Sequence, residues 1–471
     1  MERHNKHYIN GTWVESNGTD FLEVVNPATE QVIAEVARGN AEDVDVAVNA
    51  AVSAFDGWSR STVADRVDVI RALADTIEAN GDEVTESIMA EIGQPVTYAH
   101  RASTTTTVND LRNFADALPH VQWEEKIGSS RVRRLPVGVV GAITAWNGPI
   151  RSVCLKAGAA IAAGSTVVLK SSEVAPLTPF LLAGYTEKAG LPAGVFNLVT
   201  GTGPEVGEAI VDHPAVDMVS LTGSVRAGSR VMEVASRRVK RVALELGGKS
   251  ANVILPDADL EKAIVSGVQD AFRNSGQACG ALTRFLVPRD RLAEAEAFAA
   301  QTAGAFVLGD PADPATQLGP LANADQYNRV RGHIDRAIND GVKLVTGGLD
   351  RPAGLDTGYY VQPTIFSGTN NDRIARDEVF GPVIVIIPFD DEEDAIRIAN
   401  DTDYGLAGGV WAADAEHARQ VAGRIRTGRV RINGTPIDMR APHGGLKLSG
   451  IGREMGRHGI EDFLEYQSLH G

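Results

Sequence analysis

The chain has little cysteine, no long apolar runs and no clustered metal-binding residues. Among 471 residues there are only two cysteines, Cys154 and Cys279. They cannot form a disulfide framework for so long a chain, so we expect a reducing, cytoplasmic location. No stretch approaches about 18 uninterrupted apolar residues, and the polar residues 1–7 are unlike a secretory signal. The ten histidines show neither HExxH nor Cys/His spacing, so no metal site is expected.

The charge balance excludes a further class of partner. The formal net charge is -16, whereas binding to nucleic acid requires clustered Lys and Arg. Hydrophobic residues make up 43% of the chain and charged residues 23%, as in ordinary globular proteins. We therefore expect two or three domains, with neither a nucleic-acid nor a membrane partner.

Short β-rich runs alternate with helical patterns from residue 137 onward. Strands are predicted at 137–144, 166–170, 195–199, 218–221 and 241–246, with helices between them. This alternation predicts a parallel sheet covered by helices. Amphipathic helices are predicted upstream at 44–55, 64–79 and 82–92. A second α/β unit is predicted beyond the pair Gly247-Gly248, with strands at 251–255, 283–287, 342–345, 383–389, 408–412 and 429–432 and a helix at 260–274.

Two segments contain candidate reactive groups. Cys279 ends the small-residue run Asn274-Ser275-Gly276-Gln277-Ala278-Cys279, and Glu245 stands in Leu244-Glu245-Leu246-Gly247-Gly248-Lys249. A thiol attacks as the thiolate, and a nearby carboxylate can take up protons or activate water. Taken alone, a buried structural cysteine is the alternative interpretation.

Four strand ends offer groups for a nucleotide or an oxyanion. The run Gly201-x-Gly203-x-x-x-Gly207 departs from GxGxxG, but it follows a strand and opens a helix, as Thr222-Gly223-Ser224 does next. Such helix N-termini favour anions. Lys170-Ser171-Ser172-Glu173 can bind a ribose, and the Asn147 amide can donate to an oxyanion. The alternatives are plain turns and a solvated Lys/Glu pair.

In this order, the segments resemble the aldehyde dehydrogenase superfamily over nearly the whole chain. The most specific matches are Leu244–Lys249, Asn274–Cys279, Glu378–Val383 and Pro442–Glu454. The resemblance implies NAD-dependent oxidation of an aldehyde to the carboxylic acid through a thiohemiacetal and thioester on Cys279.

The resemblance also implies a role for each matching residue. Asn147 and the Cys279 backbone N–H hold the oxyanion, Glu245 activates water, and Lys156 and Glu454 help to relay protons. The expected cofactor is NAD, with NADP possible, because Glu173 should repel a 2′-phosphate. The expected cofactor-binding residues are Ile143, Trp146, Lys170, Ser172, Glu173, Gly203, Gly207, Thr222, Gly223, Ser224, Leu246, Glu378 and Phe380.

The substrate tunnel is expected to be wide. The family often carries aromatic residues where this chain has Gly148, Leu155 and His443, so a bulky, branched or aromatic aldehyde is expected. Gly148, Ser152, Leu155, Ala278 and His443 are the expected lining. No arginine flanks Cys279, which disfavours a carboxylate-bearing semialdehyde, although Arg151 or Arg440 can still reach the substrate.

The resemblance implies an α/β fold in three parts. A Rossmann-like dinucleotide-binding domain is expected at 1–120 and 136–247, and a catalytic domain at 248–440. A β-hairpin oligomerisation element is expected at 121–135 and 455–471, with 441–454 returning to the active site. A homodimer or homotetramer follows.

Three other functions remain open at this point. One is a CoA-acylating semialdehyde dehydrogenase, although such relatives usually lack the glutamate found here as Glu245. Another is a catalytically silent structural or binding relative, although Cys279, Glu245 and Asn147 are all present. The third is a thiol esterase that works without NAD.

Overall fold

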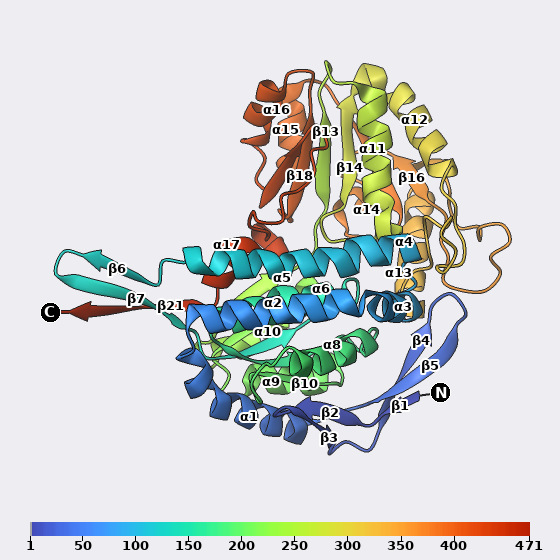
Figure 1. Ribbon diagram of the computed structural model, residues 1–471. Helices are drawn as coiled ribbons and strands as arrows, with labels where there is room; N and C mark the ends of the chain where they lie inside the picture. Colours follow the sequence, from blue (N-terminus) through green and yellow to red (C-terminus); the bar gives the residue numbers. More distant parts are fainter. Residues whose placement is uncertain (1) are drawn as a thin grey trace.

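Two α/β units and a protruding three-stranded sheet make up the protein (Figure 1). The structure is a computed structural model that describes residues 2–471. Within this range, no helix is long and apolar enough to cross a membrane. Both large sheets confirm the α/β class that the sequence predicts.

The first unit is built on an eight-stranded sheet with a parallel centre. Its order is β20-β12-β11-β8-β9-β10-β2-β3, in which β12 to β10 run parallel. The central strands are β8 (Val139–Ile143), β9 (Thr166–Lys170), β10 (Phe196–Val199), β11 (Met218–Thr222) and β12 (Arg241–Glu245). All five fall where strands were predicted. Antiparallel strands β2 (Lys6–Ile9), β3 (Thr12–Glu15) and β20 (Gly450–Ile451) extend its edges.

Helices cover both faces of this sheet (Figure 1). The three amphipathic helices predicted near the N-terminus are α1 (Ala41–Ser59), α2 (Val63–Ala79) and α3 (Gly81–Ile92). The first two begin at capping boxes, Asn40 with Asp43 and Thr62 with Asp65, because these side chains accept otherwise unpaired helix N–H groups. The other principal helices are α5 (Thr106–Ala117), α8 (Leu177–Lys188), α9 (Glu208–Asp212) and α10 (Val225–Ser236).

One helical segment runs from the active-site side into the core. It comprises α6 (Pro149–Val153), a π-helical turn (Cys154–Gly158) and α7 (Ala159–Ala163). Small residues let it pack closely: a Cβ at Gly158 would lie 2.9 Å from the Leu111 side chain. Cys154 is fully buried here, and burial raises the pKa of its thiol, so it is an inert core residue.

The second unit is built on a seven-stranded sheet with the order β15-β16-β17-β14-β13-β18-β19. All its pairs are parallel except β15 with β16. Its strands are β13 (Ser250–Ile254), β14 (Leu282–Pro288), β15 (Lys343–Thr346), β16 (Thr364–Ser367), β17 (Val383–Phe389), β18 (Ala407–Trp411) and β19 (Arg429–Ile432). The covering helices are α11 (Leu260–Phe272), α12 (Leu292–Gly304), α13 (Ala324–Asn339), α15 (Glu392–Asn400) and α16 (Ala415–Ala422).

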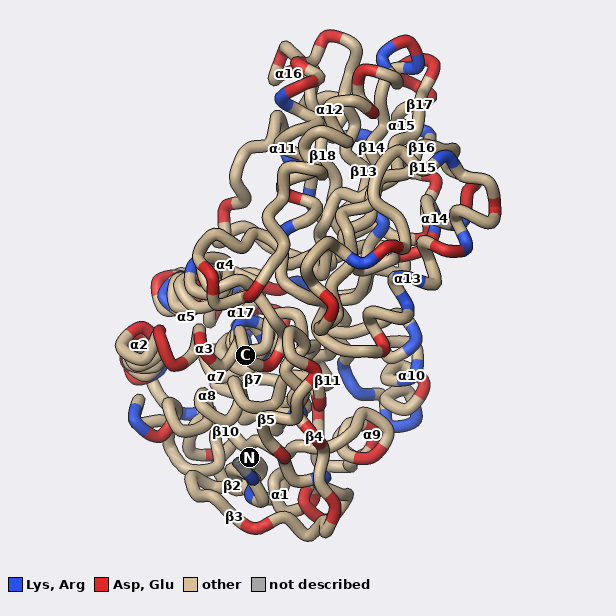
Figure 2. Tube along the Cα trace, turned by 90° about the vertical axis from the view of Figure 1, so that its right-hand side faces the viewer, with Lys and Arg blue, Asp and Glu red and all other residues tan. Residues whose placement is uncertain are grey.

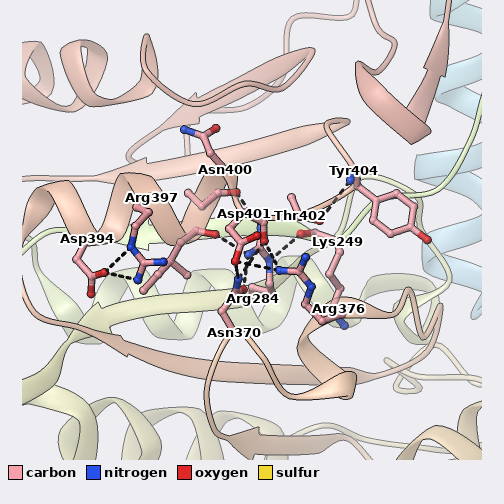
Figure 3. Close-up of polar contacts among 12 residues, drawn as sticks. Lys249, Arg284, Asn370, Arg376, Asp394, Arg397, Asn400, Asp401, Thr402 and Tyr404 are labelled. Carbon is pink, nitrogen blue, oxygen red and sulfur yellow. Dashed lines mark hydrogen bonds and ion pairs between the residues drawn. The ribbon is translucent and has the colours of Figure 1, made fainter.

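A buried arginine ties this sheet to α15 (Figure 3). Arg284 donates to the carbonyl oxygen of Lys249 at 2.9 Å and to those of Ile398 and Ala399 at 2.8 and 2.9 Å. It also donates to Asn370 Oδ1 at 2.8 Å. These four bonds satisfy most of the guanidinium and fix the backbone at Lys249, immediately after the Gly247-Gly248 pair.

A three-stranded antiparallel sheet protrudes from the first unit (Figure 1). Strands β6 (Glu124–Ile127) and β7 (Ser130–Pro136) form a hairpin, and β21 (Leu464–His470) pairs along β7 from Pro136 to Ser130. Gly128 turns the hairpin with φ 62°. The last strand of the chain therefore lies beside a segment more than 300 residues earlier. A separate small sheet near the N-terminus has the order β1 (Glu2–His4), β5 (Gln31–Ala37), β4 (Phe21–Asn26).

Charges of both signs are interspersed over the chain, with a group of basic positions along α10 (Figure 2). Arg230 on this helix pairs with Glu208 and Glu233, at 2.5 and 2.7 Å. Arg237 also pairs with Glu233. The basic group is thus largely engaged by neighbouring carboxylates.

Candidate active site

A cavity of about 230 Å³ is lined by residues from both α/β units. Many of the predicted site residues meet in it, although they come from distant parts of the sequence. Its lining includes Trp146, Asn147, Gly148, Ser152, Leu155, Thr222, Gly223, Ser224, Glu245, Leu246, Cys279, Glu378, Phe380, His443 and Glu454. Ala145, Arg151, Gly247 and Arg329 complete it.

Cys279 follows a strained loop that comes directly after the end of α11. Asn274 and Ser275 have φ values of 52° and 54°, so both adopt the left-handed region that non-glycine residues rarely occupy. A Cβ at Gly276 would overlap the Gly381 backbone, so only glycine fits there. Gln277 braces the loop by accepting from the Ala322 N–H at 2.9 Å. The thiol is free and only partly buried, in contrast with Cys154.

Asn147 lies beside this loop. Its Nδ2 donates to the Gln277 carbonyl oxygen at 3.2 Å, and its own carbonyl accepts from Gln94 Nε2 at 3.1 Å. The first bond orients the side-chain amide toward the Cys279 loop, and the second fixes the Asn147 backbone. An N–H donor held there can serve a negative oxygen on a carbon attacked by the thiolate.

Glu245 ends β12 and is buried, as expected of a base that is shielded from bulk water. Its Oε1 lies 3.0 Å from His443 Nε2, and its Oε2 has no partner among the described residues. Burial opposes the imidazolium, but the Glu245 charge and hydrogen bonds to Cys279 and Glu245 outweigh it and raise the pKa of His443 to about 9. Sequence reasoning placed His443 in the substrate lining and missed this pair.

Lys156 lies outside the main cavity and pairs with Glu454, which lines it. Lys156 Nζ donates to Glu454 Oε1 at 2.6 Å and to Ser220 Oγ at 3.2 Å. Burial works against the carboxylate, but Lys156 outweighs it and lowers the pKa of Glu454. The Glu454 backbone also pairs with that of His443, at 2.7 and 2.8 Å. The two buried ion pairs are thus joined through one β-bridge.

Glu378 reaches across to the Gly247-Gly248 turn. Its Oε1 accepts from the Gly248 N–H at 3.0 Å, and a Cβ at Gly247 would overlap its carboxylate. Phe380, with φ 57°, packs edge-on against Trp146 with ring centroids 5.5 Å apart. A carboxylate and two rings therefore converge on the same cavity.

The N-terminus of α10 faces this cavity through Thr222, Gly223 and Ser224. Ser224 is the N-cap, and its hydroxyl accepts from the Ala227 N–H at 3.2 Å. Because unpaired helix N–H groups and the helix dipole favour anions, this end of the twelve-residue α10 suits a phosphate.

The remaining predicted cofactor residues lie outside the cavity lining. Lys170 ends β9 and pairs with Glu173 at 2.6 Å, the lysine buried and the carboxylate partly exposed. Ser172, which lies between these two residues in the sequence, is buried. Gly207 lies beside Ile143, since a Cβ there would be 3.9 Å from the Ile143 side chain. Around Gly203, a Cβ would meet only open space.

Two substrate expectations change with the structure. Ala278 lies outside the main cavity and lines a small separate one with Gly276 and Phe380. Arg440 is exposed and paired with Asp438, whereas Arg151 lines the cavity and donates to Asp110 at 2.7 Å. Of the two arginines expected to reach the substrate, only Arg151 lines the cavity. Nothing in the sequence indicated Arg329, which comes from α13.

Comparison with known proteins identifies the family of the chain. A model described as the aldehyde dehydrogenase family matches residues 13–469. The chain is 46% identical to the 3-succinoylsemialdehyde-pyridine dehydrogenase of a Pseudomonas species, over all of this chain and 99% of that protein. A putative aldehyde dehydrogenase of Staphylococcus haemolyticus is 41% identical over 100% and 99% of the two chains.

Solved structures agree as well. A mutant of aldehyde dehydrogenase C from Pseudomonas syringae, with NAD+ and octanal, has a TM-score of 0.98 and 47% identity, with 99% and 96% coverage. A Mycobacterium tuberculosis aldehyde dehydrogenase with NAD+ has a TM-score of 0.97 and 42% identity, with 99% and 98% coverage. Fold and site together define a cysteine-based oxidoreductase. The chain belongs to the aldehyde dehydrogenase family, which confirms the resemblance seen in the sequence.

Proposed function

We propose that this chain oxidises an aldehyde to the carboxylic acid with NAD as the acceptor, through a thioester on Cys279 that water hydrolyses. One observation carries the proposal: Cys279, Asn147 and Glu245 line the same cavity. A nucleophile, an oxyanion donor and a base are the three groups that covalent acyl chemistry needs.

The first step forms the covalent bond. The Cys279 thiolate attacks the carbonyl carbon, so that a C–S bond forms and the π electrons move to oxygen. The Asn147 amide and the Cys279 N–H hold that oxygen. Bound NAD supplies an acceptor for the hydride that leaves the carbon. Restoring the C=O bond then leaves a thioester on Cys279.

The second step releases the acid. Glu245 takes a proton from water, the water oxygen attacks the thioester carbon, and the C–S bond breaks to return the thiolate. Glu245 must then lose its proton. Glu454 lines the same cavity as Glu245, which supports a role for the buried Lys156–Glu454 pair in passing that proton onward.

The residues around the cavity fit NAD. The α10 N-terminus suits the pyrophosphate, Glu378 suits the nicotinamide ribose, and Phe380 with Trp146 suits the ring. Lys170 and Glu173 suit the adenosine ribose, where a carboxylate accepts hydroxyl groups and repels a 2′-phosphate. NAD+ bound to the relatives from Pseudomonas syringae and Mycobacterium tuberculosis supports this choice.

The substrate that we propose is a bulky, branched or aromatic aldehyde. Gly148 and Leu155, small for their positions, line the cavity, and a Cβ at Gly148 would meet only the Arg151 side chain, at 4.0 Å. One relative is named for a pyridine-bearing semialdehyde and another was solved with octanal. Leu155→Trp should raise the KM for aromatic aldehydes and leave that for acetaldehyde nearly unchanged. A wild-type enzyme that prefers acetaldehyde would contradict the proposal.

We also propose a homodimer or homotetramer, formed through the protruding sheet. Ile127, Tyr466 and Leu469 on β6 and β21 are exposed at 58%, 68% and 43%, an apolar group that a monomer leaves in water. Light scattering should give a multiple of 49.9 kDa. The double substitution Ile127→Asp and Tyr466→Asp should shift that mass toward the monomer.

The test of the reaction is NADH formation across linear, branched and aromatic aldehydes, with and without CoA. Turnover without CoA supports hydrolysis, whereas strict dependence on CoA would favour the acylating alternative. Acid release without NAD would indicate a thiol esterase. Bound NAD with no turnover for any aldehyde would favour a silent relative.

A further inference from the structure

Three different metal-binding side chains meet in the cavity. One ligand atom from each of Glu245, Cys279 and His443 lies within 4.8 Å of the other two. Glu245 and His443 are buried, at 5% and 8% exposure. A thiolate, an imidazole and a carboxylate are the ligand types that zinc takes in proteins. The expectation of no metal site rested on sequence spacing, and these residues come from three separate segments.

Small movements of the three side chains would bring their ligand atoms to the spacing of a zinc site. With ligand bonds of about 2.0–2.3 Å, the ligand atoms of a tetrahedral ion lie about 3.3–3.8 Å apart. His443 Nε2 and Glu245 Oε1 are 3.0 Å apart, so an ion needs only a small separation of this pair. Glu245 Oε2 and His443 Nδ1 have no partner among the described residues, which leaves a second atom on each side chain to turn toward an ion.

The surroundings hold two of the three ligands in place. The His443 backbone is fixed by its paired bonds to Glu454, and Glu245 ends a strand that pairs with β20 at Gly450. Arg429, which is close to Cys279, and Arg151 contribute positive charge nearby, and Glu454 contributes negative charge. The charges around the three ligands are therefore of both signs. One thiolate and one carboxylate among the ligands carry two negative charges, which balance the two positive charges of a divalent cation.

We propose that Cys279, His443 and Glu245 form a zinc site that takes one Zn²⁺ per chain, with a solvent oxygen as the fourth ligand. Binding deprotonates the thiol and the imidazolium and releases those protons to solvent. No electron is transferred, so the site is reversible. The ion ties up the nucleophile and the base together, and Zn²⁺ is therefore a reversible inhibitor that competes with the aldehyde.

Equilibrium dialysis of the purified full chain against Zn²⁺ in thiol-free buffer tests the site directly. We expect one ion per chain, removed by EDTA. Cys279→Ala and His443→Phe should each weaken binding more than about 100-fold, since loss of an outer partner alone weakens metal sites about 10- to 100-fold. Melting curves of both variants show that they are folded.

A matched control and a spectroscopic probe distinguish this site from surface binding. His417 also pairs with a glutamate, Glu392, at 2.6 Å, but on the surface and without a thiol. His417→Phe should leave zinc binding unchanged. Co²⁺ in place of zinc should give a thiolate charge-transfer band that Cys279→Ala lacks. Equal binding by all variants, or no binding, would overturn the site. Because dialysis needs neither aldehyde nor NAD, failure of the proposed reaction would leave this result interpretable.

Discussion

His443 Nε2 lies 3.0 Å from Glu245 Oε1 in a site where both side chains are almost fully buried. The two residues are 198 positions apart, and the segment that follows β19 brings them together. Burial alone would lower the pKa of His443. The charge of Glu245 outweighs this effect and raises the pKa of His443 to about 9. At neutral pH the imidazolium of His443 therefore forms an ion pair with Glu245, the proposed base.

His443→Phe should change how stability depends on pH. The pKa of His443 rises on folding from 6.5 to about 9, so its stabilising effect is complete below pH about 6.5 and is lost as pH rises through 9. The variant should therefore lack a pH-dependent contribution of up to about 3 kcal/mol. Urea unfolding of both proteins between these pH values measures it. His417→Phe, which removes a partly exposed His–Glu pair, provides the control. Parallel pH profiles for the wild type and His443→Phe would contradict the buried ion pair.

Cys279→Ala and Glu245→Gln should block different steps. Without the thiol no covalent adduct forms, so no NADH appears. The amide in Glu245→Gln has no basic oxygen, so hydride transfer still occurs but hydrolysis slows by about 10²- to 10⁴-fold, the usual contribution of a general base. Rapid mixing should then show a burst of one NADH per active site, followed by slow turnover. Glu233→Gln, which changes an exposed glutamate on α10, should behave as the wild type. Wild-type steady-state rates in Glu245→Gln would exclude Glu245 as the base.

Glu173→Gln should relax the choice of cofactor. Glu173 Oε2 accepts from buried Lys170 Nζ at 2.6 Å, so removal of the carboxylate charge leaves the ammonium available to a 2′-phosphate. We expect kcat/KM for NADP relative to NAD to rise about tenfold, which corresponds to about 1.4 kcal/mol. Initial rates with both cofactors measure it. An unchanged ratio would show that Glu173 does not set the preference.

The parts of the fold that could be predicted are those with strong local patterns. The five central strands of the first sheet are short apolar runs between helices, and the structure has all of them. Strands β2 and β3 have four residues each and β20 has two, too few for a recognisable alternation. The resemblance pointed to Cys279, Asn147 and Glu245, and all three line one cavity. The partner of His443 could not be predicted, because pairing across 198 residues leaves no trace in local spacing.

Lys249→Met should stabilise the protein at neutral pH. Lys249 is fully buried beside the Arg284 cluster, and its Nζ has no hydrogen-bond partner among the described residues (Figure 3). Burial, reinforced by Arg284, lowers the pKa of Lys249 to about 7. The unfolded amine binds a proton below pH about 10.5 and the folded amine only below about 7, so stability falls as pH drops between these values. Methionine removes this penalty and keeps the backbone carbonyl that Arg284 binds.

The expected gain is on the order of 4 to 5 kcal/mol at pH 7 and shrinks as pH approaches 10.5. Urea unfolding at pH 7 and at pH about 9.5 measures both ends of this range. Lys262→Met provides the control, because Lys262 is exposed on α11 and its amine stays hydrated in both states. A variant less stable than the wild type at pH 7 would show that the ammonium of Lys249 is compensated, most directly by the charge of Glu378, which favours it. In that case the buried ammonium of Lys249 would stabilise the carboxylate of Glu378, which lines the cavity.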